Sequence, residues 1–223
     1  MQTPVHEQPV QVMTGPVRLE GNLSLPDGAR GIVLFAHGSG SSRHSPRNRF
    51  VAAQMVEARL ATLLIDLLTL DEERVDMQTR RLRFDIGLLA RRLVGAANWI
   101  LNHPDLRGLG IGLFGASTGA AAALVAAAEL PHAVRAVVSR GGRPDLAGVA
   151  LSRVRAPTLL IVGGNDGPVI SMNREALVHL QTEKRLEIVP GAAHLFEEPG
   201  ALERVAALAQ QWFLRYLPQP EGV

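Results

Sequence analysis

The amino-acid sequence predicts an α/β fold in which helices cover both faces of a mostly parallel sheet of eight strands. Three observations lead to this expectation. Short apolar runs, typical of buried parallel strands, alternate with helical segments six times. An alternating apolar and polar pattern, typical of an antiparallel hairpin, precedes them. Loops rich in glycine follow several of the apolar runs, at the strand ends where ligands bind in such sheets.

Two alternating segments, residues 10–13 and 17–25, flank Thr14-Gly15-Pro16 and predict the N-terminal hairpin. A chain of 223 residues is most simply one domain with a sizeable core. We expect an N-terminal tail, a single α/β domain and a C-terminal tail, which cover residues 1–9, 10–218 and 219–223.

The rest of the chain divides into apolar strands and amphipathic or alanine-rich helices. The expected buried strands cover residues 31–36, 61–66, 110–114, 133–138, 157–162 and 186–189. The expected helices cover residues 47–59, 82–101, 118–129, 169–181 and 202–217. Residues 67–79 are polar and are expected to be irregular, at the rim of the site. This division leaves no segment for a large cap domain.

Composition narrows the possible classes of function. The chain has no cysteine, which excludes disulfides, thiolate metal sites and a cysteine nucleophile. The formal net charge is only +2, so the overall charge predicts no nucleic-acid partner. No apolar run approaches the roughly 18–20 residues of a membrane span, and residues 1–7 lack the features of a secretory signal. We therefore expect a globular protein without a membrane partner, located in the cytoplasm.

Residues Gly115-Ala116-Ser117-Thr118-Gly119 match Gly-x-Ser-x-Gly, a pattern that places a serine on a sharp turn between a strand and a helix. The residues two before and two after the serine must be small, because larger side chains would collide across the turn. The helix that follows points its N-terminus at the serine, where negative charge develops during acyl transfer. The alternative interpretation is that Ser117 only caps this helix.

A serine hydroxyl needs a base to become a good nucleophile, and the base needs an orienting acid. His194 lies in a Gly/Ala-bordered loop after the last expected strand, and Asp166 lies in a Gly-Gly-Asn-Asp-Gly turn after the previous one. The chain order Ser117, Asp166, His194 predicts a catalytic triad. Asp145 is a second candidate for the acid, because it also follows a strand. No histidine and carboxylate pair has metal-ligand spacing, and the chemistry requires no cofactor.

The chain resembles proteins of the α/β-hydrolase fold, and among them the dienelactone-hydrolase-like group with a serine nucleophile, over nearly its whole length. Four segments carry the resemblance: residues 37–40, 115–119, 163–166 and 191–194. The resemblance implies a Ser (or Cys)-His-Asp triad that hydrolyses esters, lactones or thioesters through an acyl-enzyme. It also implies an oxyanion hole formed by the N–H groups of Thr118 and of Ser39 or Gly38. The chain has Ser117 where dienelactone hydrolases proper carry cysteine.

Basic residues gather after two of the strands that lead to the expected site. They are Arg43, His44, Arg47, Arg49, Arg140 and Arg143. One interpretation is a surface on which arginines pair with acidic residues at positions 71, 72, 73 and 76. The other is an anion clamp, in which Arg43, His44, Arg140 and Arg143 bind a carboxylate- or phosphate-bearing substrate. His37 is expected to hydrogen-bond within its own loop rather than to catalyse.

Together these features predict a serine hydrolase that cleaves carboxylic esters of small molecules through an acyl-enzyme on Ser117. A thioesterase or acyltransferase on the same triad is one alternative, and a non-catalytic domain that keeps the fold is another. The protein is expected to be a monomer or a homodimer.

Overall fold

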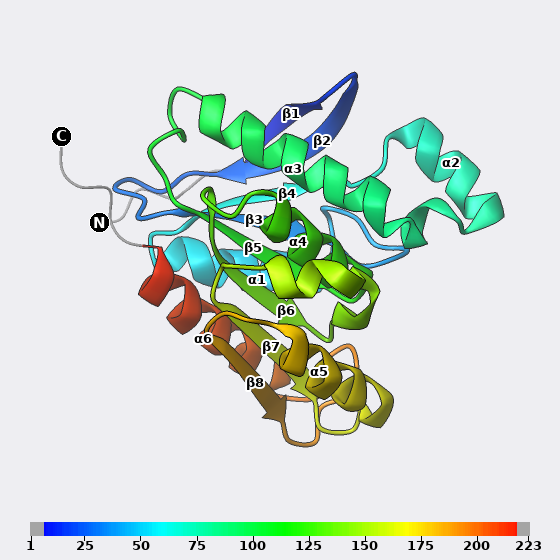
Figure 1. Cartoon of the computed structure of the whole chain (residues 1–223). Helices are drawn as coiled ribbons and strands as arrows, with labels where there is room; N and C mark the ends of the chain where they lie inside the picture. The colour runs from blue at the N-terminus through cyan, green and yellow to red at the C-terminus, as the bar shows by residue number, and fades with distance from the viewer. Residues whose placement is uncertain (1–6, 218–223) are drawn as a thin grey trace.

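The computed structural model describes residues 7–217 and shows one sheet of eight strands in the order β1-β2-β4-β3-β5-β6-β7-β8 (Figure 1). β1 pairs with β2, and β2 with β4, in antiparallel fashion, whereas all other neighbouring strands are parallel. The strands are β1 (Gln8–Thr14), β2 (Val17–Ser24), β3 (Ile32–Ala36), β4 (Ala61–Ile65), β5 (Ile111–Ala116), β6 (Val134–Arg140), β7 (Thr158–Gly163) and β8 (Lys184–Val189). The expected fold class is therefore confirmed.

Helices pack on both faces of the sheet, and each face has its own apolar cluster. The helical elements are α1 (Pro46–Glu57), α2 (Leu70–Thr79), η1 (Leu82–Phe84), α3 (Ile86–Asn102), α4 (Thr118–Glu129), η2 (Pro144–Arg153), α5 (Gly167–His179) and α6 (Ala201–Tyr216). α1 and α6 bury their apolar side chains on one face, and α3, α4 and α5 do so on the other. Successive side chains of the central strands alternate between the two clusters, as Val137 and Val138 do.

Three local expectations are corrected by the structure. β1 begins at Gln8, two residues before the expected start of the domain. Residues 70–79, expected to be irregular, form helix α2, whose N-terminus is closed by a capping box between Thr69 and Glu72. A short turn of helix at η1 precedes α3, which starts one turn later than expected, with Asp85 as its N-cap. Residues 1–6 and 218–223, which include most of the two expected tails, lie outside the described part of the chain.

The order of the strands places the expected site at a topological switch point. β3 and β5 are neighbours at the centre of the sheet, and the chain leaves them towards helices on opposite faces, α1 and α4. Such a divergence opens a crevice at the carboxyl ends of the two strands. The loop that begins at His37 and the turn at Ser117 both follow these strand ends.

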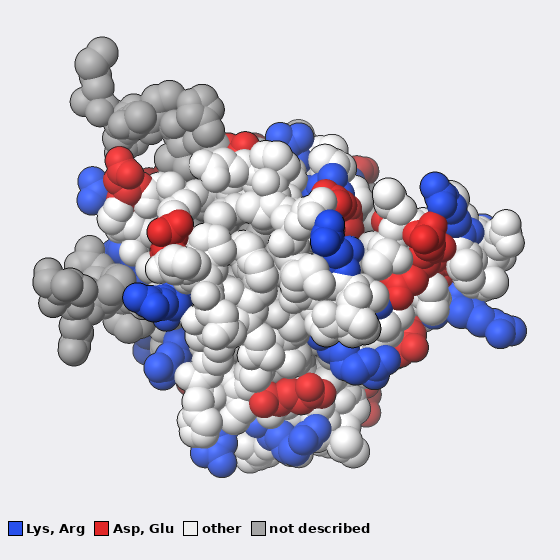
Figure 2. All heavy atoms as spheres, turned by 90° about the horizontal axis from the view of Figure 1, so that it is seen from above, with Lys and Arg blue, Asp and Glu red and all other residues white. Residues whose placement is uncertain are grey.

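The outer surface carries charges of both signs. Figure 2 shows Lys and Arg side chains interspersed with Asp and Glu side chains around a broad uncharged area on the face seen from above. Among the helices of residues 7–217, none has both the length and the apolar character needed to cross a membrane.

Candidate active site

Ser117 occupies a sharp turn between β5 and α4 with backbone angles of φ 50° and ψ −120°. A positive φ is uncommon for a residue other than glycine and marks stored backbone strain. The side chain of Ser117 makes no capping hydrogen bond to α4, which argues against the interpretation as a simple N-cap. The hydroxyl of Ser117 thus lies at the end of β5 and makes no hydrogen bond to the helix that follows it.

The two glycines of the motif are required by close backbone contacts. A Cβ atom on Gly115 would lie 2.4 Å from the Cα of Ala120, on the following helix. A Cβ atom on Gly119 would lie 2.4 Å from the carbonyl oxygen of Ala36 at the end of β3. Both distances are too short for any side chain. The pattern Gly-x-Ser-x-Gly therefore reflects the packing of α4 against β3 and β5.

His194 and Asp166 meet at the carboxyl ends of β7 and β8. The Nδ1 atom of His194 lies 2.6 Å from Oδ2 of Asp166. Because a carboxylate only accepts, Nδ1 carries the hydrogen and Nε2 keeps the free lone pair. The carboxylate side chain is 14% exposed, whereas the imidazole is 40% exposed. The pair therefore presents a basic nitrogen to a solvent-accessible site.

Hydrogen bonds join the two loops that carry Asp166 and His194 to each other. The N–H of Asn165 donates to the carbonyl of Ala192 (2.9 Å), and its side-chain amide donates to the carbonyl of Gly191 (2.8 Å). Phe196 has a positive φ of 56° and is fully buried in the cluster beneath α1 and α6. Glu198 accepts a hydrogen bond from the N–H of Ala193. These contacts fix the position of the loop around His194.

Ser117 and His194 both lie against the segment that follows β6. The N–H of Ser117 donates to the carbonyl of Arg140 (3.2 Å), and the carbonyl of Ser117 accepts from the N–H of Arg143 (3.1 Å). Gly141 lies on the other side, where an added Cβ would be 3.1 Å from the carbonyl of His194 and 3.5 Å from its Cε1. Residues 140–143 thus join the serine to the histidine.

The residues expected to form an oxyanion hole line one cavity of about 540 Å³. Gly38, Ser39 and Thr118 are among its lining residues. Gly38 lies close to the serine, because a Cβ there would be 3.1 Å from the Cβ of Ser117. Thr118 is the first residue of α4, where an N–H has no acceptor within the helix. The apolar part of the cavity is formed by Leu67, Leu68, Met77 and Leu89.

His37 hydrogen-bonds within its own loop, as expected, and it also binds the loop that follows β4. Its Nδ1 lies 2.9 Å from the carbonyl of Gly38, and its Nε2 accepts from the N–H of Leu67 at 3.1 Å. Both contacts fit a neutral ring protonated on Nδ1. Burial lowers the pKa of His37 below its usual value of 6.5, against the raising effects of Gly38 and Asp66. Neither ring nitrogen is left free for catalysis.

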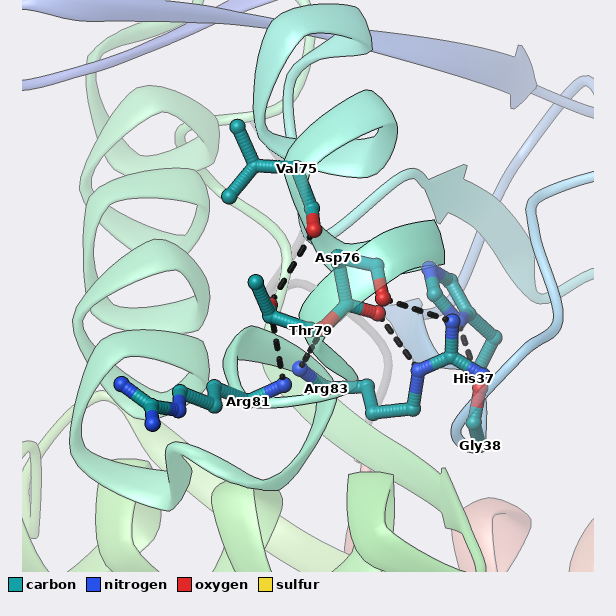
Figure 3. Close-up of polar contacts among 7 residues, drawn as sticks. All are labelled: His37, Gly38, Val75, Asp76, Thr79, Arg81 and Arg83. Atoms are coloured by element: carbon teal, nitrogen blue, oxygen red, sulfur yellow. Dashed lines mark hydrogen bonds and ion pairs between the residues drawn. The ribbon is translucent and has the colours of Figure 1, made fainter.

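Helix α2 and η1 contribute an ion pair to the far wall of the cavity, which the sequence did not predict. Figure 3 shows Asp76 and Arg83 pointing toward one another, with His37 and Gly38 at the same corner. Asp76 accepts from both the backbone N–H and the guanidinium of Arg83. Burial raises the pKa of Asp76, but these bonds outweigh it and lower the pKa overall. The capping-box pattern from Thr69 to Glu72 is the sequence signal that could have located this helix.

Most rim arginines are paired with carboxylates. Arg43 binds Asp66 through its backbone N–H, at 2.7 Å, and through its guanidinium. Arg143 binds both oxygens of Asp145, at 2.9 and 2.7 Å. These pairs favour the interpretation in which Arg43 and Arg143 pair with acidic residues at the surface. Their partners, Asp66 and Asp145, are not the acidic residues that were expected.

Three further features bear on the rim. Asp145, the second candidate for the triad acid, has both oxygens bound by Arg143, so it does not orient a histidine. His44 lines the cavity, whereas Arg140 is buried beside the serine turn. Within residues 7–217, no three or more His, Asp or Glu side chains are grouped in a way that could hold a metal ion.

Comparison with known proteins gives a consistent assignment. A crystal structure of a dienelactone hydrolase from Anabaena variabilis has a TM-score of 0.95 and 66% identity, covering 96% of this chain and 100% of that one. A dienelactone hydrolase-like promiscuous phosphotriesterase, P91 from metagenomic libraries, shares the fold with a TM-score of 0.77 at 16% identity, covering 95% of this chain and 98% of that one.

A Mycobacterium tuberculosis protein provisionally named a phosphoribosyl transferase is 56% identical over 221 residues, which is 98% of this chain and 49% of that protein. The chain therefore spans about half the length of the curated relatives it matches. The model of the dienelactone hydrolase family matches residues 20–217. The chain belongs to the dienelactone hydrolase family of α/β hydrolases.

Proposed function

We propose that this protein is a serine hydrolase that cleaves carboxylic esters, with Ser117 as nucleophile, His194 as general base and Asp166 as the acid that orients it. The observation that carries the proposal is the 2.6 Å contact between His194 and Asp166, because the His194 loop lies against residues 140–143, to which the strained turn at Ser117 is hydrogen-bonded. Membership of a hydrolase family supports the same class of reaction.

The reaction proceeds in two steps. Nε2 of His194 takes the proton of Ser117 as its oxygen attacks the carbonyl carbon, and the N–H groups of Thr118 and of Ser39 or Gly38 stabilise the oxyanion. The bond to the leaving alcohol then breaks, and His194 returns the proton to the alcohol oxygen. Water, deprotonated by the same histidine, attacks the acyl carbon; the bond to the serine oxygen then breaks, and His194 gives the proton to that oxygen, which releases the acid and free Ser117.

The acyl group is proposed to bind in the cavity beside the oxyanion donors. Its apolar wall suits an acyl chain, because burying apolar surface contributes roughly 25 cal/mol per Å². Glu73 is at the same wall, and burial together with the charge of Asp66 raises its pKa above the usual 4.5. The wall therefore disfavours further negative charge.

The proposal is tested by steady-state hydrolysis of neutral acetyl esters. Changing Asp166→Asn should lower kcat by about 10,000-fold, because the histidine would be held in the wrong tautomer. Asp145→Asn is the matched control and should leave kcat near the wild-type value. The reverse result, with Asp145→Asn inactive and Asp166→Asn active, would show that the acid is wrongly assigned. Acetyl thioesters in the same assay separate an esterase from a thioesterase.

A further inference from the structure

Arg140 is a buried arginine without a carboxylate partner. It is 8% exposed, and neither its Nε nor its Nη1 makes a hydrogen bond or reaches solvent. Other arginines around the site are paired, as Arg43 is with Asp66, Arg83 with Asp76 and Arg143 with Asp145. Within residues 7–217, no acidic side chain forms an ion pair with Arg140. A buried, unpaired guanidinium is costly for a folded protein.

The position of Arg140 relates it directly to the nucleophile. It is the last residue of β6 and lies opposite Ala116, the residue before Ser117, in the sheet. Its carbonyl accepts the N–H of Ser117. Val138, two residues earlier, belongs to the apolar cluster under α1 and α6, so Arg140 points to that same face.

The charges near Arg140 strengthen the case for an anion. Arg47, in the first turn of α1, is the charged side chain that acts on the pKa of Arg140, and it is itself paired with Glu197 at 3.1 Å. Burial, and then the repulsion from Arg47, lower the pKa of Arg140 to about 10, so the guanidinium remains charged at neutral pH. Of these two cations only Arg47 is paired with a carboxylate, so the charge of Arg140 is left without a partner, and an anionic ligand would neutralise it.

The same neighbours place Arg140 on the histidine side of the serine. Gly141 follows Arg140 and borders His194, and Glu197 lies three residues beyond that histidine. The cavity with the oxyanion donors does not include Arg140 and is walled by α2 instead. Because the histidine protonates the departing oxygen, the leaving alcohol lies on its side of the serine.

We propose that Arg140 binds an anionic group, a carboxylate or a phosphate, on the alcohol half of the ester. This inference rests on the proposed function, and it makes Arg140 a residue that determines specificity. Nε and Nη1 of Arg140 are enclosed and have no hydrogen-bond partner, whereas Nη2 is not among these enclosed atoms. The anion therefore approaches the guanidinium at Nη2. The acyl half is then neutral and occupies the cavity beside Glu73.

The kinetic test compares acetyl esters of three alcohols, 3-hydroxypropanoate, 2-hydroxyethyl phosphate and 2-methoxyethanol, together with monoethyl succinate, whose charge is on the acyl half. Arg140→Met should lower kcat/KM for an ester with an anionic alcohol by roughly 10- to 100-fold, the usual effect of losing a hydrogen bond to a charged group. Neutral and acyl-charged esters should change by less than about 2-fold, well below the effect of one lost bond. Loss on the carboxylate or the phosphate ester identifies the anion.

Two variants serve as controls for this assay. Arg135→Met removes an exposed arginine from the other end of β6 and should leave all four substrates unchanged. Arg140→Lys keeps the charge and should restore part of the selectivity. Equal losses on all esters in Arg140→Met, or a loss confined to monoethyl succinate, would overturn the proposal.

A binding measurement separates this inference from the proposed function. Inorganic phosphate or 3-hydroxypropanoate should raise the thermal unfolding midpoint of the wild type but not of Arg140→Met, at ionic strength matched with sodium chloride. Equal midpoints with and without both anions in the wild type would contradict an anion site. If the wild type hydrolyses no neutral ester, the proposed function fails, whereas the midpoint shift still decides whether Arg140 binds anions.

Discussion

At the scale of single residues, the site requires glycine, which has no side chain, at three positions where segments of the backbone lie close together. Gly115 and Gly119 let α4 approach the ends of β3 and β5, and Gly38 lets the cavity loop approach Ser117. The approach turns the first N–H groups of α4 toward the place where an oxyanion would form. The strain stored at Ser117 is of the order of 1–3 kcal/mol and is maintained by this packing.

Gly119→Ala tests this packing directly. The new methyl group would lie 2.4 and 2.5 Å from the carbonyl oxygens of Ala36 and His37, so the turn must shift. We expect the free energy of unfolding to fall by about 1–3 kcal/mol and ester hydrolysis to be lost. Gly108→Ala is the control, since nothing lies within 4 Å of its added Cβ. Wild-type stability in Gly119→Ala, measured by urea unfolding, would disprove the requirement.

At the scale of elements, hydrogen bonds tie the loops after four parallel strands to each other in two pairs. His37 links the loop after β3 to the N–H of Leu67 after β4, and Asn165 links the loop after β7 to the one after β8. The first link depends on a neutral imidazole, because Nε2 accepts a hydrogen bond there. Protonation of that nitrogen would break it.

The pH dependence of stability reports on the His37 link. The folded-state pKa of His37 is lowered by burial below the 6.5 of the unfolded chain. Its contribution is therefore fully present above about pH 6.5 and is lost as the pH falls below that value. We expect His37→Gln, which keeps an acceptor but does not titrate, to show a smaller fall in the free energy of unfolding between pH 7 and pH 5. The exposed His132→Gln serves as control, and an unchanged slope in His37→Gln would refute the assignment.

At the scale of the whole molecule, the two apolar clusters on either face of the sheet share the same strands. Trp99 on α3 packs against one cluster, and Trp212 on α6 is buried in the other, where its indole N–H donates to the carbonyl of Pro157. Because every central strand contributes to both clusters, neither face can lose its packing alone.

We therefore expect one cooperative unfolding transition. Trp99→Phe and Trp212→Phe each leave a single tryptophan that reports on one face of the sheet. In each variant the fluorescence midpoint should match the circular dichroism midpoint of that same variant. Any effect of the substitution on stability shifts both midpoints equally. A fluorescence midpoint that differs from the circular dichroism midpoint in either variant would show that the faces unfold separately.

Much of this architecture could be predicted from local patterns. The apolar runs indicated all six parallel strands, and the glycine-flanked Ser117, Asp166 and His194 indicated where three of the loops come together. Helix α2 was missed because its exposed, charged sequence has no apolar stripe, and only its cap marks it. Pairings such as Asp76 with Arg83, and the lack of one at Arg140, arise between elements and are not encoded in any local pattern.

The central claim is that Ser117 is an activated nucleophile, and covalent labelling tests it most directly. A fluorophosphonate should modify the wild-type protein once, and peptide mass mapping should locate the adduct on Ser117. The adduct should be absent from Ser117→Ala and form far more slowly in His194→Gln, because the base would be lost. An unlabelled wild type, or an adduct that persists in Ser117→Ala, would contradict the account.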